Sequence, residues 1–346
     1  MGILIAGYYG YRNWGDEGSL ATLLQVLPRA AVCVLSGDPP FTEATYGVRA
    51  LPRMELRTVR RAIRESDALI LGGGSLLQDA TSLRSLLYYL ALIRWGLRAH
   101  GRVLLVGQGV GPLRRRIGRR LAAHLLQRVP FLSVRDADSA RMLEGLGVSG
   151  ATVDADLTWA LEAQPAHVAL EAGARWVGLA PRLWADAPVS QAFADLCRRL
   201  HADGYRTLLI PMQESQDRAL CEAIAAETGA RALPAPQHPA QLLGVMARLE
   251  AMIAMRLHGA IFAASAGAPV LCVSYDPKVD ALAAQISAPT VPLCALNGGL
   301  AESWGAFPRE ALRARLQETT PALQHAAHDL LQRVGQFCAG EDSLAR

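Results

Sequence analysis

The chain has 346 residues, of which 51% are hydrophobic and 19% are charged. At roughly 150 residues per domain this length predicts two domains, each with its own core. The composition excludes intrinsic disorder and a small disulfide-stapled module. The formal net charge is only +4, and no basic stretch is interleaved with aromatic residues, so nucleic acid is not an expected partner.

The cysteines and the first residues both favour the cytoplasm. The six cysteines are far apart and form no C-x-x-C pair, which favours reduced thiols over a disulfide framework or a zinc site. The chain starts with an apolar run that lacks the basic region of a signal peptide. Its longest apolar stretch, residues 86–97, is shorter than the roughly 20 residues that span a bilayer. We therefore expect a cytoplasmic protein.

In the first half of the chain, short aliphatic runs alternate with helical patterns, which is typical of βαβ units and a parallel sheet. Together these elements form an expected N-terminal α/β domain, residues 1–161. Helices are expected at residues 18–27, 56–66, 83–100, 117–129 and 139–146. Strands are expected at residues 3–6, 32–35, 68–71, 103–106, 131–134 and 151–153.

A polar, proline-containing stretch after Leu161 is typical of a linker between domains, and a second alternating series follows it. This series predicts a C-terminal α/β domain, residues 168–308. The long helical pattern at 309–337 lies in a final segment, residues 309–346, that is expected to pack back on the first domain. In the second domain, helices are expected at 191–202, 216–228 and 240–250, and strands at 176–180, 207–210, 230–233, 252–254, 270–274 and 291–293.

The expected fold class is therefore α/β, with two Rossmann-like parallel-sheet domains and a cleft between them. Open parallel sheets bind ligands at the carboxyl ends of their strands. The loops that follow the strands are thus where binding residues are expected.

The loop after the first strand contains Asn13, Asp16 and Glu17. Its glycines do not reproduce G-x-G-x-x-G, so a dinucleotide fingerprint is absent. One interpretation is that these polar side chains hold sugar hydroxyls or supply a base. The other is that Asp16 only caps the helix that follows.

Two further loops at strand ends are rich in glycine, one with Gly73 and Gly74 and one around Gln108. Glycine lets a ligand approach the backbone closely and exposes N–H groups near a helix start. Three such loops in one domain favour a polar ligand over turn chemistry alone.

In the second domain, Arg256 and His258 interrupt a long apolar run where the strand 252–254 ends. Both stand at the start of a helix of small residues, whose first N–H groups and dipole favour an anion. This pattern predicts an anion site with a titratable group beside it. The alternative is that His258 caps the helix and Arg256 makes a surface ion pair.

Two more cations are expected at the same edge. Arg182 closes the first strand of the second domain, and Lys278, the only lysine of the chain, follows the strand 270–274. Lys278 is either a phosphate contact or a solvated residue on a turn. Converging cations of this kind would suit a small, doubly anionic ligand.

Residues 114–120 contain five arginines beside an apolar helix. This run is either a solvated face or a contact with an anionic membrane surface. The sequence holds no G-x-x-x-x-G-K-[ST], no G-x-S-x-G, no H-E-x-x-H and no cluster with metal-ligand spacing. No metal and no other cofactor is therefore expected.

Several of these motifs together resemble the polysaccharide pyruvyl transferase family, and within it the CsaB type. The resemblance implies a two-domain fold similar to the GT-B glycosyltransferases, phosphoenolpyruvate as donor, and a pyruvate ketal formed on a sugar. That sugar is typically an N-acetylmannosamine residue of a lipid-linked cell-wall polysaccharide precursor. In chain order, the motifs are Asn13-Trp-Gly-Asp-Glu17, Gly72-Gly-Gly-Ser75, Gly107-Gln-Gly-Val-Gly-Pro112, Ser133-Val-Arg-Asp136, Arg256-Leu-His-Gly259 and Tyr275-Asp-Pro-Lys278.

The resemblance also implies roles for single residues. Arg256 and Arg182 resemble the arginines that hold phosphoenolpyruvate, and His258 resembles the catalytic histidine. The enzyme would work in the cytoplasm, at the inner face of the membrane if its acceptor is lipid-linked. The expected catalytic residues are His258 and Arg256, the donor-binding residues Arg256, Arg182, Leu257, Gly259 and Lys278, and the acceptor-binding residues Asn13, Asp16, Glu17, Gly73, Gly74, Gln108 and Arg135.

A nucleotide-sugar glycosyltransferase of the same architecture is the alternative. Such enzymes commonly hold the donor ribose with an acidic residue in the helix after the Arg256 motif. Residues 259–267 contain no acidic residue, and the chain has no Glu between Glu250 and Glu302. A non-catalytic sugar-binding module would leave the pairing of Arg256 with His258 without a purpose.

Overall fold

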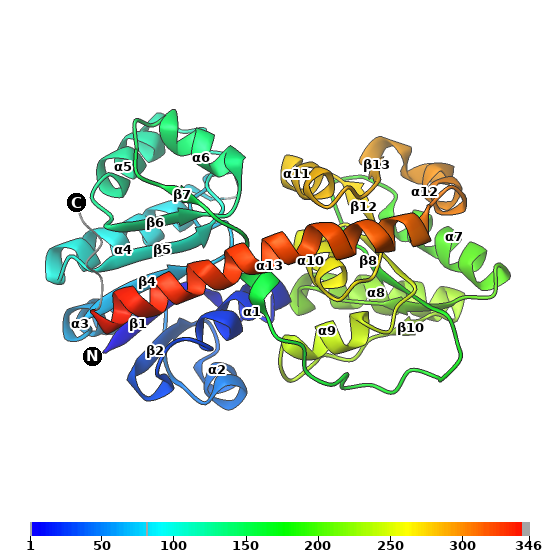
Figure 1. Cartoon of the computed structure of the whole chain (residues 1–346), viewed down its shortest axis with the longest axis horizontal. Helices are drawn as coiled ribbons and strands as arrows, with labels where there is room; N and C mark the ends of the chain where they lie inside the picture. Colours follow the sequence, from blue (N-terminus) through cyan, green and yellow to red (C-terminus); the bar gives the residue numbers. More distant parts are fainter. Residues whose placement is uncertain (1, 81, 341–346) are drawn as a thin grey trace. The chain divides into compact units, whose positions relative to one another are not determined.

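The computed structural model describes residues 2–80 and 82–340, so residues 341–346 of the expected C-terminal segment lie outside it. The chain forms two compact units, each a parallel sheet flanked by helices (Figure 1). Unit 1 is built from three segments: the chain up to Tyr11, Asp16–Leu161, and the chain from Gln324 on. Unit 2 consists of Arg12–Gly15 and Glu162–Leu323. The predicted fold class, two Rossmann-like parallel-sheet domains, is confirmed.

Unit 1 contains a seven-stranded sheet in the order β3-β2-β1-β4-β5-β6-β7, with every neighbouring pair parallel. The carboxyl ends of all seven strands therefore lie at one edge. The strands predicted for this domain are all present. The strands are β1 (Ile3–Tyr9), β2 (Val32–Ser36), β3 (Arg49–Pro52), β4 (Ala68–Gly72), β5 (Val103–Gln108), β6 (Phe131–Val134) and β7 (Thr152–Val153).

Side-chain caps begin several helices of unit 1. Asp38 accepts from the Phe41 N–H at 3.1 Å, and Asp136 accepts from the Ser139 N–H at 2.7 Å. The elements α2 and β3 are not predicted from the sequence, because both are short and follow glycine- or proline-containing stretches. The helices are α1 (Trp14–Leu23), α2 (Pro39–Tyr46), α3 (Leu56–Glu65), α4 (Leu83–Ala99), α5 (Arg116–Leu126) and α6 (Ala137–Glu144).

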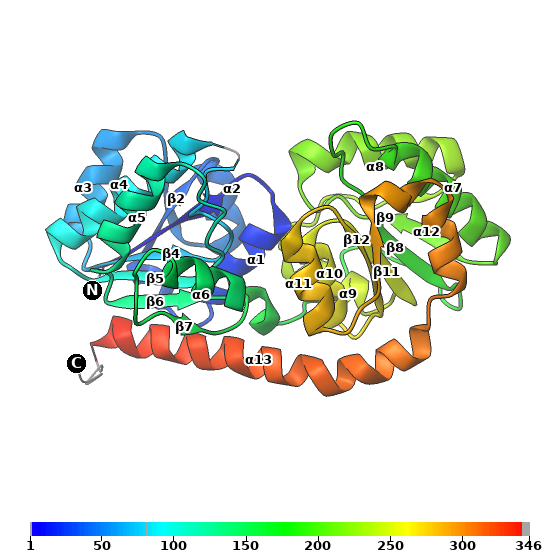
Figure 2. The ribbon, with the colours of Figure 1, turned by 90° about the horizontal axis from the view of Figure 1, so that it is seen from above.

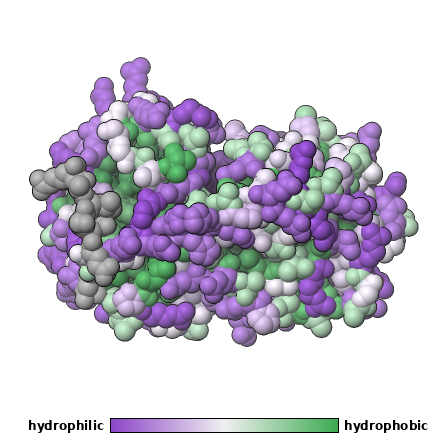
Figure 3. Space-filling model, in the orientation of Figure 1, coloured by the Kyte–Doolittle hydropathy of each residue, from purple (hydrophilic) through white to green (hydrophobic). Residues whose placement is uncertain are grey.

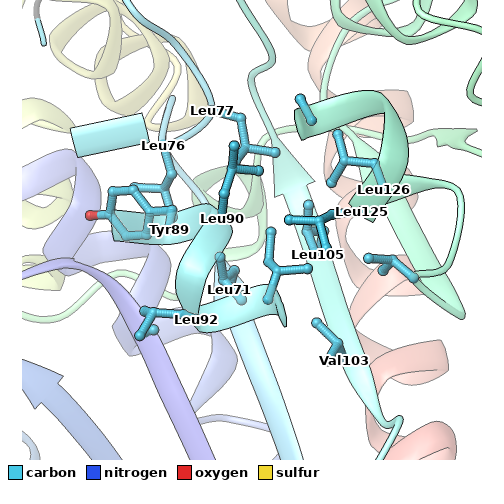
Figure 4. Close-up of a cluster of buried hydrophobic side chains, with 14 of the residues drawn as sticks. Leu71, Leu76, Leu77, Tyr89, Leu90, Leu92, Val103, Leu105, Leu125 and Leu126 are labelled. Atoms are coloured by element: carbon cyan, nitrogen blue, oxygen red, sulfur yellow. The ribbon is translucent and has the colours of Figure 1, made fainter. Parts of the chain in front are cut away.

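Helices α3, α4 and α5 lie side by side (Figure 2) and cover one face of this sheet. Figure 4 shows the cluster beneath them, in which Leu71 and Leu105 from the strands meet Leu90 of α4 and Leu125 of α5. All four side chains are buried, and a fully buried Leu contributes about 1.5–3 kcal/mol. This packing fixes the first turns of the three helices at the carboxyl edge of the sheet.

Unit 2 contains a six-stranded parallel sheet in the order β10-β9-β8-β11-β12-β13. All its predicted strands are present, and α9 ends at Met246, four residues before the predicted helix end at residue 250. The strands are β8 (Trp176–Ala180), β9 (Arg206–Leu209), β10 (Arg231–Ala232), β11 (Ala251–Ala254), β12 (Val270–Ser274) and β13 (Thr290–Pro292). The helices are α7 (Val189–Ala202), α8 (Glu214–Thr228), α9 (Ala240–Met246), α10 (Leu257–Ser265), α11 (Pro277–Gln285) and α12 (Leu296–Gly305).

The last helix, α13 (Arg309–Ala339), contributes to both units: its residues up to Leu323 belong to unit 2 and those from Gln324 on to unit 1. Leu316 is buried in the first part, and Leu330 and Val334 in the second. Hydrophilic side chains line its outward side (Figure 3). Within residues 2–80 and 82–340, no helix is long and apolar enough to cross a membrane.

Candidate functional site

Four loops of unit 2 gather polar side chains at the carboxyl edge of the sheet. They follow β9, β8, β11 and β12, which are neighbours in the sheet. The Arg182 N–H donates to the Met255 sulfur at 3.3 Å, and the Arg182 guanidinium donates to the Tyr275 hydroxyl at 2.8 Å. Contacts between these loops thus bring the predicted residues together from positions up to 93 apart in the chain.

Arg182 lies among aromatic rings. Its guanidinium carbon is 5.0 Å from the Trp184 ring centre and 5.3 Å from that of Tyr275. Such rings attract a cation without neutralising its charge. No carboxylate of the described residues pairs with Arg182. Its positive charge therefore remains available to an anionic ligand.

Arg256 is held by Asp217 of α8. Its Nε and Nη2 donate to the two carboxylate oxygens at 3.0 and 2.6 Å, a bidentate pair, and Nη1 donates to the Gln213 side chain at 3.3 Å. The Arg256 side chain is 11% exposed and that of Asp217 is not exposed. The ion pair that the sequence left as an alternative does form, but it is buried rather than at the surface. Sequence analysis missed Asp217 because helix α8 carries it far from the Arg256 motif.

His258 is packed against the first motif of the chain. A Cβ at Gly15 would lie 2.0 Å from the imidazole Nδ1, so only glycine lets the ring sit there. Two backbone contacts hold the segment around Gly15. The backbone N–H of Trp14 donates to the Met212 carbonyl at 2.9 Å, and Asn13 and Gln213 form an antiparallel β-bridge. The structure thus brings Asn13 and His258 into unit 2 together.

The remaining predicted donor residues stand at helix starts. Leu257 and Gly259 lie in the first turn of α10, which Arg256 precedes without a side-chain cap. Lys278 lies in the first turn of α11, where its backbone N–H donates to Asp276 at 3.0 Å, and the residue is half-buried. Two helix N-termini beside Arg182 make this edge electropositive.

In unit 1, two predicted glycines adopt backbone conformations that side chains rarely take. Gly73 has φ of +65° and Gly74 has φ of +71°. A Cβ at Gly74 would come within 2.5 Å of an Asp16 carboxylate oxygen, and one at Gly73 within 2.4 Å of the Ser19 hydroxyl. The glycine loop therefore lies directly against the start of α1.

Glu17 is fully buried and holds the loop after β1. Its two carboxylate oxygens accept from the Gly10 N–H and the Tyr46 hydroxyl, both at 2.9 Å. Burial, followed by the charge of Glu17, raises the pKa of Tyr46 well above its ordinary value, so its hydroxyl stays a donor. Asp16, one residue earlier, is also largely buried.

Gln108 and Arg135 fasten the next loops of the same edge. The fully buried Gln108 amide donates to the carbonyls of Leu71 and Gly73 at 3.0 and 2.9 Å, while its Oε1 has no donor among the described residues. A buried acceptor of this kind is destabilising unless a water or ligand supplies a hydrogen. The guanidinium of Arg135 bonds Asp156 at 2.9 Å and the Ser75 hydroxyl at 3.1 Å.

One buried cation of unit 1 escaped the sequence analysis. Arg53 follows β3, is 7% exposed and bonds the Gly7 carbonyl at 3.0 Å and the Tyr89 hydroxyl at 2.9 Å. Its Nε has no hydrogen-bond partner, and no carboxylate of the described residues pairs with it. The centres of four rings lie within 5.0–5.8 Å of its guanidinium carbon, those of Tyr8, Tyr11, Tyr88 and Tyr89. The signal available in the sequence was an arginine directly after the short Ala-Leu-Pro run of β3.

The described residues contain no group of three or more His, Cys, Asp or Glu side chains that could hold a metal ion.

The fold resembles solved structures of sugar-nucleotide enzymes. A Staphylococcus aureus MnaA structure with UDP matches with a TM-score of 0.68 at 10% identity, covering 98% of this chain and 97% of that one. A putative UDP-N-acetylglucosamine 2-epimerase from Listeria monocytogenes matches with a TM-score of 0.68 at 12% identity, covering 99% and 98%. Anabaena HepE with UDP and glucose matches with a TM-score of 0.60 at 12% identity, covering 98% and 100%. These likenesses show a GT-B-like fold.

Among curated proteins, no sequence match was found. The family model described as polysaccharide pyruvyl transferase matches residues 17–277, more than half of the chain. This range includes Gly73, Gln108, Arg182, Arg256 and His258, whereas Asn13, Asp16 and Lys278 lie just outside it. The chain is therefore a transferase that belongs to the polysaccharide pyruvyl transferase family.

Proposed function

We propose that this enzyme transfers pyruvate from phosphoenolpyruvate to two hydroxyls of one sugar, forming a ketal and releasing phosphate. The observation that carries the proposal is Arg182, a cation without a carboxylate partner among the described residues, beside the first turns of α10 and α11. Within the family, we propose the CsaB type. Its acceptor would be an N-acetylmannosamine residue of a lipid-linked cell-wall polysaccharide precursor, reached at the inner face of the membrane.

Phosphoenolpyruvate carries a carboxylate and a phosphate, and unit 2 offers matching groups. Arg182 binds one anion through its planar fork. The N–H groups of Leu257 and Gly259 and the ammonium of Lys278 receive the other. Arg256 contributes less net positive charge than Arg182, because the Asp217 carboxylate already pairs with its Nε and Nη2. Arg182 is thus the main donor clamp.

The reaction requires a proton to be added to C3 of the donor and protons to be removed from the two sugar hydroxyls. The first sugar hydroxyl adds to C2 of the donor while C3 gains a proton and becomes a methyl group. The C2–O bond to phosphate then breaks, phosphate leaves, and the second hydroxyl adds to C2 and releases its proton. His258 is the proposed general acid or base, because imidazole exchanges protons near neutral pH. Gly15 leaves the space that its ring occupies.

We propose that Asn13 and the polar groups at the carboxyl edge of unit 1 serve to bind the acceptor. Asp16, the N–H groups of Gly73 and Gly74, and Oε1 of Gln108 supply donors and acceptors for hydroxyls. Glu17 and Arg135 act through the loops that they fasten.

Calorimetric titration tests the donor. Phosphoenolpyruvate should bind, and UDP-N-acetylglucosamine should bind much more weakly or not at all, because α10 carries no acidic residue for a ribose. Tight binding of the UDP-sugar without any response to phosphoenolpyruvate would identify a nucleotide-sugar glycosyltransferase instead.

A further inference from the structure

Five of the seven large hydrophobic side chains that are exposed within the described residues lie on one surface of unit 1. We call them the apolar patch. Its most exposed members are Met54 at 69% and Ile117 at 58%. Isolated exposed hydrophobic residues are common in soluble proteins, but a concentration on three neighbouring helices marks a contact surface. The apolar patch consists of Met54, Leu56, Leu87, Ile117 and Leu121.

Contacts between the helices bring the apolar patch together. The Tyr88 hydroxyl of α4 donates to the Arg53 carbonyl at 2.8 Å, which places the start of α3 beside the first turns of α4. A Cβ at Gly118 of α5 would lie 2.8 Å from Leu86, so the start of α5 packs closely against the same turns. The patch therefore lies on the first two turns of α4 and α5 and around the start of α3.

Exposed arginines surround the apolar patch, and none of them pairs with a carboxylate in the described part of the chain. Glu55 is the acidic side chain of this surface, and it accepts from the Thr58 hydroxyl. The buried carboxylate of Asp79 instead accepts hydrogen bonds from the backbone N–H groups of Arg114 and Arg115, at 2.7 and 2.8 Å. These bonds attach the arginine-rich turn before α5 to the body of unit 1. The arginines are Arg57, Arg84, Arg114, Arg115, Arg116 and Arg120.

The position of these charges disfavours helix α5 taken alone. Its first turn contains no acidic residue and its N-cap, Arg115, makes no side-chain cap hydrogen bond. Positive charges at a helix N-terminus oppose the helix dipole. The Asp79 carboxylate at this helix start offsets part of that repulsion, and an external anion near the exposed arginines would offset more of it.

We propose that the apolar patch and its arginines dock unit 1 on an anionic lipid bilayer. Apolar side chains flanked by arginines suit the boundary between headgroups and acyl chains, and arginines gain by approaching acidic lipids. The helices α3, α4 and α5 follow β3, β4 and β5, so the surface adjoins the edge that carries Gly73 and Gln108. That this edge then meets a lipid-linked acceptor rests on the proposed function. The docking itself does not.

Sedimentation with lipid vesicles tests the docking in the absence of any substrate. The full chain should bind vesicles of phosphatidylcholine and phosphatidylglycerol in equal parts and should bind pure phosphatidylcholine vesicles much less. The double variants Ile117→Asp/Leu121→Asp and Arg116→Glu/Arg120→Glu should each weaken binding to the anionic vesicles by about tenfold or more. Added salt should weaken vesicle binding by the wild type and by Ile117→Asp/Leu121→Asp more than binding by Arg116→Glu/Arg120→Glu, which has lost two of the charges that salt screens.

Two control variants each carry one substitution of the same type elsewhere. Val153→Asp alters an exposed apolar residue on β7, and Arg315→Glu reverses an exposed charge on α13. Both should bind like the wild type, and thermal unfolding should show every variant folded. Absence of wild-type binding, or an equal loss in the controls, would overturn the proposal. So would a dimer in sedimentation velocity that Ile117→Asp/Leu121→Asp dissociates, because the patch would then join two copies. Phosphoenolpyruvate titration of the same variants reports separately on the proposed function.

Discussion

A Cβ at Gly15 would lie 2.0 Å from Nδ1 of His258 and 2.1 Å from its Cγ. Gly15, in the first turn of α1, and His258, in the first turn of α10, therefore occupy complementary space, although 243 positions separate them in the chain.

Replacing Gly15 by alanine should displace the imidazole of His258. Real Cβ atoms do not approach other atoms this closely, so the ring must turn or the segment must shift. We expect kcat to fall by about tenfold or more, because misplaced catalytic groups lose their alignment, while phosphoenolpyruvate affinity stays within about twofold. Gly305→Ala is the matched control, since nothing lies within 4 Å of a Cβ there. Unchanged turnover in Gly15→Ala would separate His258 from the reaction.

Replacing Asp217 by asparagine should destabilise unit 2. The change leaves the buried Arg256 guanidinium without its counter-charge, and losing one partner of a buried pair typically destabilises by about 3–5 kcal/mol. Urea unfolding measures the loss. The control is Asp195→Asn, which breaks an exposed ion pair with Arg198 and should leave the midpoint of urea unfolding unchanged. If both variants behave alike, the Arg256–Asp217 pair does not stabilise the fold.

Replacing Arg182 by lysine should weaken phosphoenolpyruvate binding by about 1.5–3 kcal/mol, the scale of a hydrogen bond to a charged group. Lysine keeps the charge but loses the planar fork. Tyr275→Phe is the control: it removes the 2.8 Å bond to Arg182 and keeps the ring, so its effect on the donor should be smaller. Wild-type affinity in Arg182→Lys, measured by calorimetry, would exclude a clamp at this position.

Replacing His258 by alanine should lower kcat by about 10²–10⁴ with little change in phosphoenolpyruvate affinity, since a proton-transfer residue acts in the transition state. His258→Gln is the finer variant, because it retains hydrogen bonding without a titratable proton. A proton-transfer role predicts no rescue by glutamine. Near-wild-type turnover in the glutamine variant would contradict it.

The cysteines should differ sharply in reactivity in the folded protein. Cys294 is exposed, whereas burial raises the pKa of Cys272 to about 12 and also raises that of Cys33. Because the thiolate is the nucleophile, a raised pKa keeps these thiols protonated and unreactive at about pH 8. Iodoacetamide labelling followed by mass spectrometry should modify Cys294 first, and Cys294→Ser should remove the fast phase. Equally fast labelling of Cys272 would contradict the packing of β12.

The sequence predicts the strands well because each is a short buried aliphatic run bounded by turn residues. It also singles out Arg256 and His258, since charged groups stand out in an apolar run. Asp217 gives no such signal, because a carboxylate in the first turns of a helix ordinarily favours the dipole. Arg53 is hidden for another reason: its tyrosine neighbours come from β1 and α4, and only the folded sheet brings them around it. Pairings of this kind depend on tertiary structure.

Helix α13 also bears on how the protein is made. Leu312 and Leu316 complete one core and Leu330 and Val334 another, yet all four follow the strands of both sheets in the chain. On the ribosome, neither unit can bury its full apolar surface until this helix has left the exit tunnel. A nascent chain halted before residue 309 thus exposes unfinished cores in both units, a form prone to aggregation and suited to chaperones. The core of each unit is therefore completed only by residues of α13.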